Sequence, residues 1–388
     1  MKEARQVERA LRIIVDYDGT FPLHHYLRNF FRAHPEMGSR DRRICSSLLY
    51  SWFRTGKLLP HLKTEARLAY AVFLTQKYRS DVADYLIKHF TSLHPEKITD
   101  TVEAKIDDIK RYQDFITEDI FPFDEKLSEG IAKHDYALSM LIQPHTWLRV
   151  NTRFIHEIKP MLEYNKIDFV QDGNSFGVEN GVNLESKGIR KEWYEVQDKS
   201  SQQTGSFYLP VKDQYWYDCC AASGGKSLLL HAMEPTVKLT VSDNRTLILK
   251  NLEARFSRAG VINYNVIVAD LEAGTPFIND EFFDGIIADV PCSGSGTWSR
   301  TPEQLSFFKE SDIDKYVERQ KKIIHHVTPL LKRGGALIYS TCSVFKKENE
   351  DIVEHICKAH NFSCEHKKTF IGIESRSDTM FAARLIKK

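Results

Sequence analysis

The sequence predicts an α/β protein whose C-terminal half contains a parallel sheet. From residue 215 onward, strand-like and helix-like segments alternate, which is typical of a parallel sheet with helices on both faces. The continuous apolar runs at 283–288 and 335–340 are typical of strands that are buried on both faces. Residues 1–135 show helical spacing and no strand-like alternation. We therefore expect a helical region to precede the α/β structure.

The 388 residues are long enough for two or three domains, and we predict three. Residues 1–135 form a helical domain, because apolar residues such as Val7, Leu11 and Ile14 recur at helical spacing. Residues 136–204 contain short strand-like segments at 147–151, 167–171 and 176–178 and a helix over 155–164, which predicts a small α/β module. Residues 205–388 carry the alternating strands and helices and form the third domain.

The charge is nearly balanced, with a formal net charge of +1, so a nucleic-acid partner would need local basicity. Residues 1–60 supply some, with 11 Lys and Arg against 6 Asp and Glu. Arg40, Arg42 and Arg43 lie at the start of a predicted helix, where positive charge opposes the helix dipole. An RNA phosphate contact would explain them, and so would salt bridges to neighbouring helices.

The cysteine pattern and the apolar runs exclude several classes of protein. The seven cysteines show neither the spacing of a disulfide framework nor the CxxC spacing of a zinc site. The N-terminus opens on a charged helix instead of a signal peptide, and no apolar run approaches the ~20 residues that span a bilayer. We therefore expect a cytoplasmic protein with reduced thiols, no bound metal and no membrane segment. We also expect it to be a monomer.

Acidic residues end the first four predicted strands of the third domain. They are Asp218, Asp243, Asp270 and Asp289. Any one of them could be a helix cap, but four together mark the carboxyl edge of the sheet, where open α/β sheets bind ligands. Asp243 follows a glycine-rich turn by about 20 residues, a spacing that suits hydrogen bonds to ribose hydroxyls. The edge is predicted to accept a nucleoside-bearing ligand.

The glycine-rich turn joins the first strand of this domain to its helix. Small residues and glycines there let the backbone approach a ligand, and the helix N–H groups point at it. Residues 225–227 resemble the end of a phosphate-binding P-loop, but the P-loop spacing needs glycine at 220, where this chain has cysteine. An NTPase is therefore disfavoured. The turn consists of Cys220, Ala221, Ala222, Ser223, Gly224, Gly225 and Lys226.

Two cysteines follow two strands of the same predicted sheet. Cys292 comes three residues after Asp289, and Cys342 follows the run at 335–340. Each alone could be a buried core thiol, because free cysteine is among the most buried residue types. Their paired placement at strand ends, one beside an aspartate, instead indicates chemistry in which one thiol attacks and the other assists.

In combination these motifs resemble those of the RNA cytosine-5 methyltransferases of the Sun/RsmB (Fmu) family. The family pattern is carried, in chain order, by residues 218–226, Asp243, Asp270, residues 289–294 and residues 341–343. The resemblance implies a Rossmann-like S-adenosylmethionine methyltransferase domain at 205–388. It also implies an RRM-like module at 136–204 and a NusB-like, RNA-binding domain at 1–135.

The resemblance also implies roles for the site residues. Cys342 would attack carbon 6 of cytosine, Cys292 would help to release the product, and Asp289 would hydrogen-bond the base. S-adenosylmethionine would be the donor, held by residues 220–226, by Asp243 on the ribose, by Asp270 near the adenine and by Asp289. Ser223 stands where the family usually has proline, and Val290 where it usually has alanine. Serine is expected to loosen the loop, which puts donor affinity in doubt.

The implied substrate is a cytosine in single-stranded or loop RNA, because the base must leave any stack to be reached. The NusB-like resemblance favours 16S-type ribosomal RNA over transfer RNA. A DNA cytosine methyltransferase is a rival, but it would use the cysteine of the Pro-Cys pair as its nucleophile. A non-catalytic RNA-binding assembly factor is a rival from another class, and the presence of both cysteines and Asp289 speaks against it.

Overall fold

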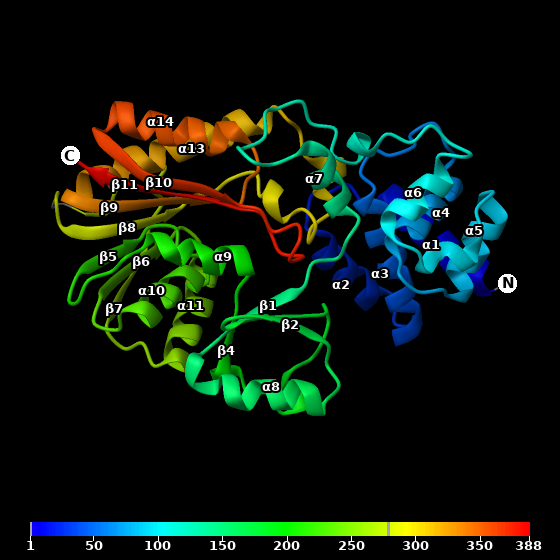
Figure 1. The fold of residues 1–388 in the computed structure, drawn as a ribbon, viewed down its shortest axis with the longest axis horizontal. Coiled ribbons are helices and arrows are strands. Elements are labelled where there is room, and N and C mark those ends of the chain that lie inside the picture. The colour runs from blue at the N-terminus through cyan, green and yellow to red at the C-terminus, as the bar shows by residue number, and fades with distance from the viewer. Residues whose placement is uncertain (1, 278–279) are drawn as a thin grey trace. The chain divides into compact units, whose positions relative to one another are not determined.

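The computed structural model describes residues 2–277 and 280–388 (Figure 1). The chain forms two compact units. The helical unit comprises Met1–Asp124, Ala132–Gln143 and Trp298–Lys309, and the α/β unit comprises Glu125–Ile131, Pro144–Thr297 and Glu310–Lys388. Within the described residues, no helix combines the length and apolar character needed to cross a membrane.

The helical unit confirms the helical character predicted for the N-terminal region. One part of its core lies between α1, α2 and α3, where Ile13, Leu23 and Leu49 are fully buried. Ser80 caps α5 by accepting a hydrogen bond from the Ala83 N–H. The helices are α1 (Lys2–Asp16), α2 (Leu23–Ala33), α3 (Ser39–Arg54), α4 (Thr64–Thr75), α5 (Asp81–Phe90), α6 (Val102–Ile109), α7 (Lys133–Met140) and α12 (Gln304–Phe307).

The two units exchange short segments, which the continuous ranges predicted from the sequence did not anticipate. Residues 298–309 belong to the helical unit because Trp298 packs its ring against Phe121 and Phe123. Residues 125–131 belong to the α/β unit because the Ser128 N–H donates a hydrogen bond to the Val344 carbonyl (2.8 Å). Both exchanges rest on contacts between residues far apart in the sequence.

A seven-stranded sheet forms the centre of the α/β unit, in the order β10-β11-β9-β8-β5-β6-β7. The strands from β5 to β9 run parallel, as predicted, and β10 and β11 are antiparallel to their neighbours. The strands are β5 (Tyr215–Asp218), β6 (Lys238–Asp243), β7 (Tyr264–Val268), β8 (Phe283–Asp289), β9 (Leu331–Thr341), β10 (Phe362–Phe370) and β11 (Met380–Lys387).

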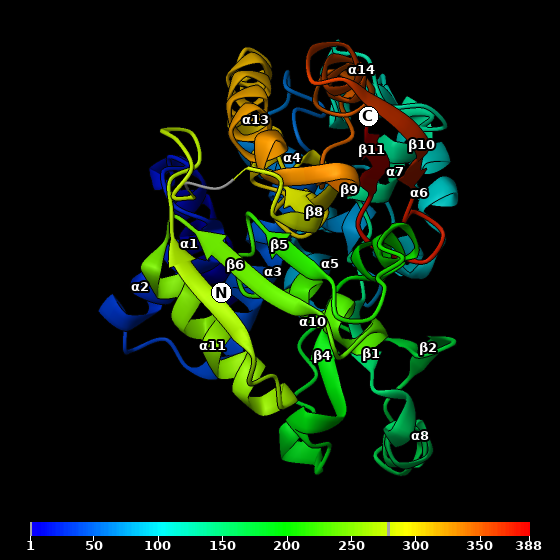
Figure 2. The same cartoon turned by 90° about the vertical axis from the view of Figure 1, so that its left-hand side faces the viewer.

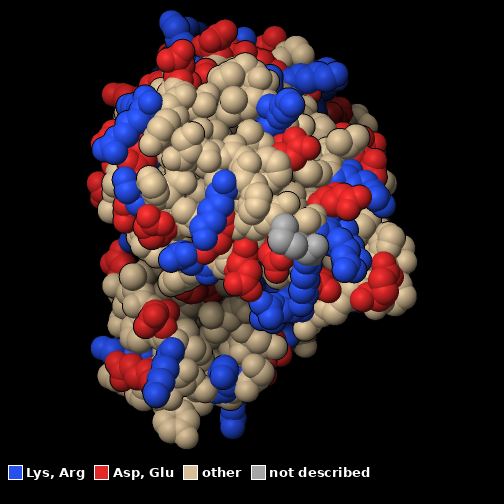
Figure 3. All heavy atoms as spheres, turned by 90° about the vertical axis from the view of Figure 1, so that its right-hand side faces the viewer, with Lys and Arg blue, Asp and Glu red and all other residues tan. Residues whose placement is uncertain are grey.

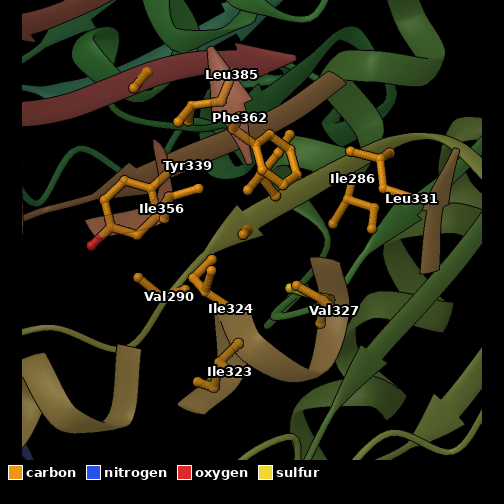
Figure 4. Packing of buried hydrophobic residues seen from close by; sticks show 14 of the residues in the cluster. Ile286, Val290, Ile323, Ile324, Val327, Leu331, Tyr339, Ile356, Phe362 and Leu385 are labelled. Carbon is orange, nitrogen blue, oxygen red and sulfur yellow. The ribbon is translucent and has the colours of Figure 1, made fainter. Parts of the chain in front are cut away.

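Helices cover both faces of this sheet, as Figures 1 and 2 show. On one face α10 (Gly225–Met233) and α11 (Thr246–Ala259) pack over a core that includes Leu230 and Phe256. On the other face, α13 (Asp312–Val327) and α14 (Glu350–Ala359) bury Ile324 and Ile356 against the strands (Figure 4). The central strands are therefore apolar on both sides, which explains their continuous apolar runs.

A second, four-stranded antiparallel sheet lies in the same unit, in the order β2-β3-β1-β4. Helix α8 (Ile155–Tyr164) buries Ile158 and Leu162 against Leu148 and Phe176 of this sheet. The strands are β1 (Thr146–Val150), β2 (Phe169–Asp172), β3 (Ser175–Val178) and β4 (Tyr194–Val196). Helix α9 (Lys199–Gln203) follows β4 and leads into the seven-stranded sheet.

Candidate active site

A cavity of about 480 Å³ lies at the carboxyl edge of the parallel strands. Asp243, Asp270 and Asp289 line it, together with Cys220 and Cys292. Because parallel strands all end at the same edge, these five residues meet there although they are separated by up to 72 positions in the sequence. The other lining residues are Cys219, Ala222, Asn244, Arg245, Ala269, Leu271, Glu272, Pro291, Tyr316, Arg319 and Ile323.

Asp243 is held in a fixed orientation by its neighbours. Its carboxylate accepts hydrogen bonds from the Arg245 side chain (2.9 and 3.0 Å) and from the Ala222 N–H (3.1 Å). Burial raises the pKa of this carboxyl, but the hydrogen bonds from Arg245 outweigh burial and lower it. Asp243 is therefore an ionised acceptor that also anchors the glycine-rich turn.

The glycine-rich turn, residues 220–226, contains two residues in the left-handed backbone region. Ala222 and Gly224 lie in the left-handed region, with φ of +45° and +81°. A Cβ on Gly224 would lie 2.7 Å from the Phe256 ring and 2.9 Å from Leu252, so the position requires glycine. The Ala221 N–H donates to the Ser242 carbonyl (2.8 Å), which joins the turn to the end of β6. We call residues 220–226 the glycine loop.

Lys226 pairs with Asp289 and does not line the larger cavity. Its ammonium donates to Asp289 Oδ2 (2.7 Å), and the Ser340 hydroxyl donates to Oδ1 (2.9 Å). Burial lowers the pKa of Lys226, but Asp289 outweighs burial and raises it, and Cys342 adds to that rise. Lys226 and Asp289 also line a second cavity of about 160 Å³ beside the glycine loop.

Asp218 differs from the other three strand-end acids. It is fully buried, accepts a hydrogen bond from the Ser227 hydroxyl (2.6 Å) and lines only the smaller cavity. Burial, assisted by Asp289, raises its pKa to about 7. Three of the four strand-end acids therefore line the larger cavity, whereas Asp218 bonds to Ser227, the residue that follows the glycine-rich turn.

The two predicted thiols lie side by side. Cys292 Sγ and Cys342 Sγ are 3.4 Å apart, and both cysteines are free. The hydrogen bond between them, together with burial and the nearby Glu348, raises the pKa of Cys292 well above its usual range. Cys292 therefore keeps its proton at neutral pH.

A buried acid that sequence reasoning missed supports both thiol-bearing loops. Glu348 accepts hydrogen bonds from the Ser293 N–H (2.8 Å) and from the hydroxyls of Ser293 and Ser343. Gln320 of α13 donates to the same carboxylate (3.1 Å). Burial raises the pKa of Glu348. In the sequence it stands in the charged run 346–351, which is typical of an exposed segment and gave no signal of this role.

Parts of the chain are similar in sequence to known ribosomal RNA methyltransferases. Residues 207–385 match the family described as 16S rRNA methyltransferase RsmB/F. The chain is 28% identical over 255 residues to ribosomal RNA small subunit methyltransferase B of Proteus mirabilis, covering 63% of this chain and 60% of that protein. It is 32% identical over 167 residues to the probable ribosomal RNA small subunit methyltransferase B of Bacillus subtilis, covering 42% and 37%. The chain thus matches less than two thirds of either relative.

Two solved structures share the fold. The crystal structure of PH0851 has a TM-score of 0.70 at 20% identity, covering 100% of this chain and 98% of that one. The structure of NSun6 from Pyrococcus horikoshii with SFG has a TM-score of 0.56 at 17% identity, covering 63% and 91%. At these identities the likeness is one of fold alone.

Proposed function

We propose that this chain methylates carbon 5 of a cytosine in RNA, because residues 207–385 match the RsmB/F family of 16S ribosomal RNA methyltransferases. One observation carries the proposal. Two free thiols lie 3.4 Å apart, and one of them, Cys292, lines the acid-lined cavity together with Asp289, which is paired with a buried lysine. That arrangement supplies a nucleophile, a proton carrier and a contact for the base at one point.

The larger cavity fits S-adenosylmethionine as the donor. Its volume of about 480 Å³ lies in the range of small-molecule sites, and its mixed carboxylate and apolar lining suits a nucleoside with a charged tail. The glycine at 224 lets the loop pack closely against Phe256 and Leu252 of α11, which fixes the loop beside the cavity. Residues 220–226, Asp243, Asp270 and Asp289 would hold the donor. When bound, it supplies an electrophilic methyl group on a sulfonium.

Cys342 would make the base reactive. Carbon 5 of cytosine is a poor nucleophile, but a thiolate that bonds to carbon 6 breaks the aromatic system and gives carbon 5 enamine character. The attacking species is the thiolate, which a nearby cation favours. The ammonium of Lys226 interacts electrostatically with Cys342, which supports this assignment.

Asp289 would hydrogen-bond the edge of the base and stabilise the charge or proton that develops at its ring nitrogen. Each of its carboxylate oxygens accepts one hydrogen bond from the protein, so each keeps a lone pair for the base. The ammonium of Lys226 pairs with Asp289 at 2.7 Å and so fixes the orientation of its carboxylate. The pair would hold the base with carbon 6 toward Cys342.

Cys292 would assist the last step. Carbon 5 loses its proton to solvent base, that electron pair restores the ring, and the carbon 6–sulfur bond breaks with its electrons on Cys342. Cys292 would then give its proton to the departing sulfur, 3.4 Å away in this structure. Its raised pKa means that the proton is present at neutral pH.

For the substrate we propose 16S-type ribosomal RNA, which the family description and the names of both relatives favour over transfer RNA. The test is methylation with a labelled donor, using 16S ribosomal RNA and transfer RNA in parallel, followed by nucleoside mass spectrometry. We expect 5-methylcytidine in the ribosomal RNA. Labelled 5-methylcytidine in transfer RNA alone would favour the transfer RNA alternative, and no methylation of either would favour a non-catalytic assembly factor.

Removal of the Asp243 carboxylate should weaken donor binding. We expect Asp243→Ala to reduce the affinity for S-adenosylmethionine by about 1–3 kcal/mol, because the ligand hydroxyls lose their acceptor and Ala222 loses its anchor. Calorimetry measures this change. Glu253→Ala, which removes an exposed acid of α11, is the control and should leave the affinity unchanged. An unaltered affinity in Asp243→Ala would mean that this acid only caps the strand end.

The arginines at the start of α3 divide into two kinds. Arg42 Nε donates to the Met37 carbonyl (2.8 Å). Arg40 instead pairs with Asp81 at 3.6 Å, and the side chains of Arg40 and Asp81 are both exposed. An exposed pair of this kind contributes little to stability. On the face shown in Figure 3, Lys and Arg are interspersed with Asp and Glu, so any RNA contact there would rest on a few residues.

We therefore expect the double change Arg40→Glu and Arg43→Glu to weaken RNA binding. For every phosphate that the variant no longer binds, the slope of log affinity against log salt should fall by roughly 0.7–0.9. Binding titrations at several salt concentrations measure that slope. Arg12→Glu, at an exposed position of α1, is the matched control. If both variants leave the slope unchanged, Arg40 and Arg43 do not bind RNA and serve only the structure of the helical unit.

A further inference from the structure

Ser223 occupies the position of the glycine loop where proline would have fixed the backbone, and serine was expected to loosen it. The structure shows a replacement for that constraint. Arg255 of α11 donates from one guanidinium nitrogen to the Ser223 carbonyl (3.0 Å) and to the Ser223 hydroxyl (2.8 Å). We propose that Arg255 is a positioning residue that holds the glycine loop in its ligand-binding conformation. This role rests on the assignment of the loop to S-adenosylmethionine.

Arg255 is itself held in place from the other side. Its Nε and second terminal nitrogen both donate to one carboxylate oxygen of Glu195 in β4 (3.0 and 2.7 Å). The two side chains are only 17% and 15% exposed, so water competes little for these bonds. A guanidinium that is fixed by one partner loses less freedom when it binds another. Glu195 therefore orients the group that Arg255 presents to Ser223.

Glu195, the acid that orients Arg255, also interacts with a second arginine, Arg149. Arg149 of β1 is opposite Glu195 in the four-stranded sheet, and it donates to Gln197 (2.8 Å). Burial lowers the pKa of Arg149 to about 10, with Glu195 opposing that fall and Arg255 adding to it. Glu195 thus offsets the repulsion between the guanidinium groups of Arg149 and Arg255. Because Glu195 lies in β4, it also links the glycine loop to the four-stranded sheet.

The loop needs such an anchor because its backbone is unfavourable. Ala222 has φ of +45°, a left-handed conformation that is unfavourable for a residue other than glycine. Asp243 holds Ala222 from one side of the loop, and Arg255 holds the next residue. A Cβ on Gly225 would lie 3.9 Å from Arg255, so the guanidinium also lies against the start of α10. Without Arg255, Ser223 would lose both bonds.

Arg255→Ala tests the proposal, with Arg258→Ala as its matched control. Arg258 lies one turn away on the same helix and pairs with the same acid at 3.8 Å, so both changes remove a cation from Glu195. We expect Arg255→Ala to raise the calorimetric Kd for S-adenosylmethionine about tenfold, and Arg258→Ala to leave it within about twofold. In methylation assays Arg255→Ala should raise the KM for the donor and leave kcat and the KM for RNA unchanged.

A double-mutant cycle separates positioning from a general loss of stability. Ser223→Ala removes one of the two bonds and should raise the Kd about threefold in the wild-type background, but not in the Arg255→Ala background. If Arg255→Ala does not fold, Ser223→Ala still carries the test. An unchanged donor Kd in Arg255→Ala or in Ser223→Ala, or additive effects, would overturn the proposal. If the wild-type chain bound no donor, the proposed function itself would fail, a result distinct from these.

Discussion

Cys292→Ala is expected to accumulate a covalent complex between the protein and its RNA. In this account Cys342 forms the bond to carbon 6, and Cys292 supplies the proton on which its release depends. Without Cys292 the methylated adduct should break down slowly, since the sulfur leaves without a proton donor 3.4 Å away. The complex should appear in denaturing gel electrophoresis as a band of reduced mobility that contains both labelled RNA and protein.

Two controls define the origin of this band. The double variant Cys292→Ala, Cys342→Ala should show no complex, because no attacking thiol remains. Cys364→Ala, which removes an exposed thiol, should behave as the wild type. A Cys342→Ala variant that traps RNA through Cys292 would reverse the two roles and revive the mechanism of the DNA cytosine methyltransferases.

Cys342→Ala is expected to lower the methylation rate by roughly 10³-fold or more, the scale of loss when a covalent nucleophile is removed. Cys342 is absent from the residues that line the larger cavity, so the calorimetric Kd for S-adenosylmethionine should stay within about twofold. Single-turnover methylation assays measure the rate. A variant that retains activity within a few-fold of the wild type would show that Cys342 is not the nucleophile.

Much of the α/β unit could be predicted because the relevant signals are local. The runs at 283–288 and 335–340 became the buried strands β8 and β9, since strands covered by helices on both faces carry apolar residues throughout. The carboxyl ends of parallel strands share one edge, so chain order alone brought Asp243, Asp270 and Asp289 to one cavity. The same rule brought Cys292 and Cys342 together.

Other features depend on contacts between distant segments and left no local signal. Arg255 and Glu348 stand among charged residues that look solvated, yet one holds the glycine loop and the other lies buried beneath both thiol-bearing loops. Asp218 differs from the other strand-end acids only because Ser227 and the surrounding structure bury it. The packing of Trp298 with Phe121 joins segments that are 177 residues apart. Periodicity and spacing carry no information on such pairings.

The central claim is that Cys342 attacks carbon 6 of a cytosine whose carbon 5 then receives the methyl group. RNA that contains 5-fluorocytidine tests it most directly, because fluorine at carbon 5 cannot leave as a proton does and the methylated adduct cannot resolve. Wild-type protein, S-adenosylmethionine and this RNA should give a stable complex whose cross-linked peptide, identified by mass spectrometry, contains Cys342. A cross-link at Cys292, or methyl transfer to unmodified RNA with no complex on the fluorinated RNA, would contradict the account.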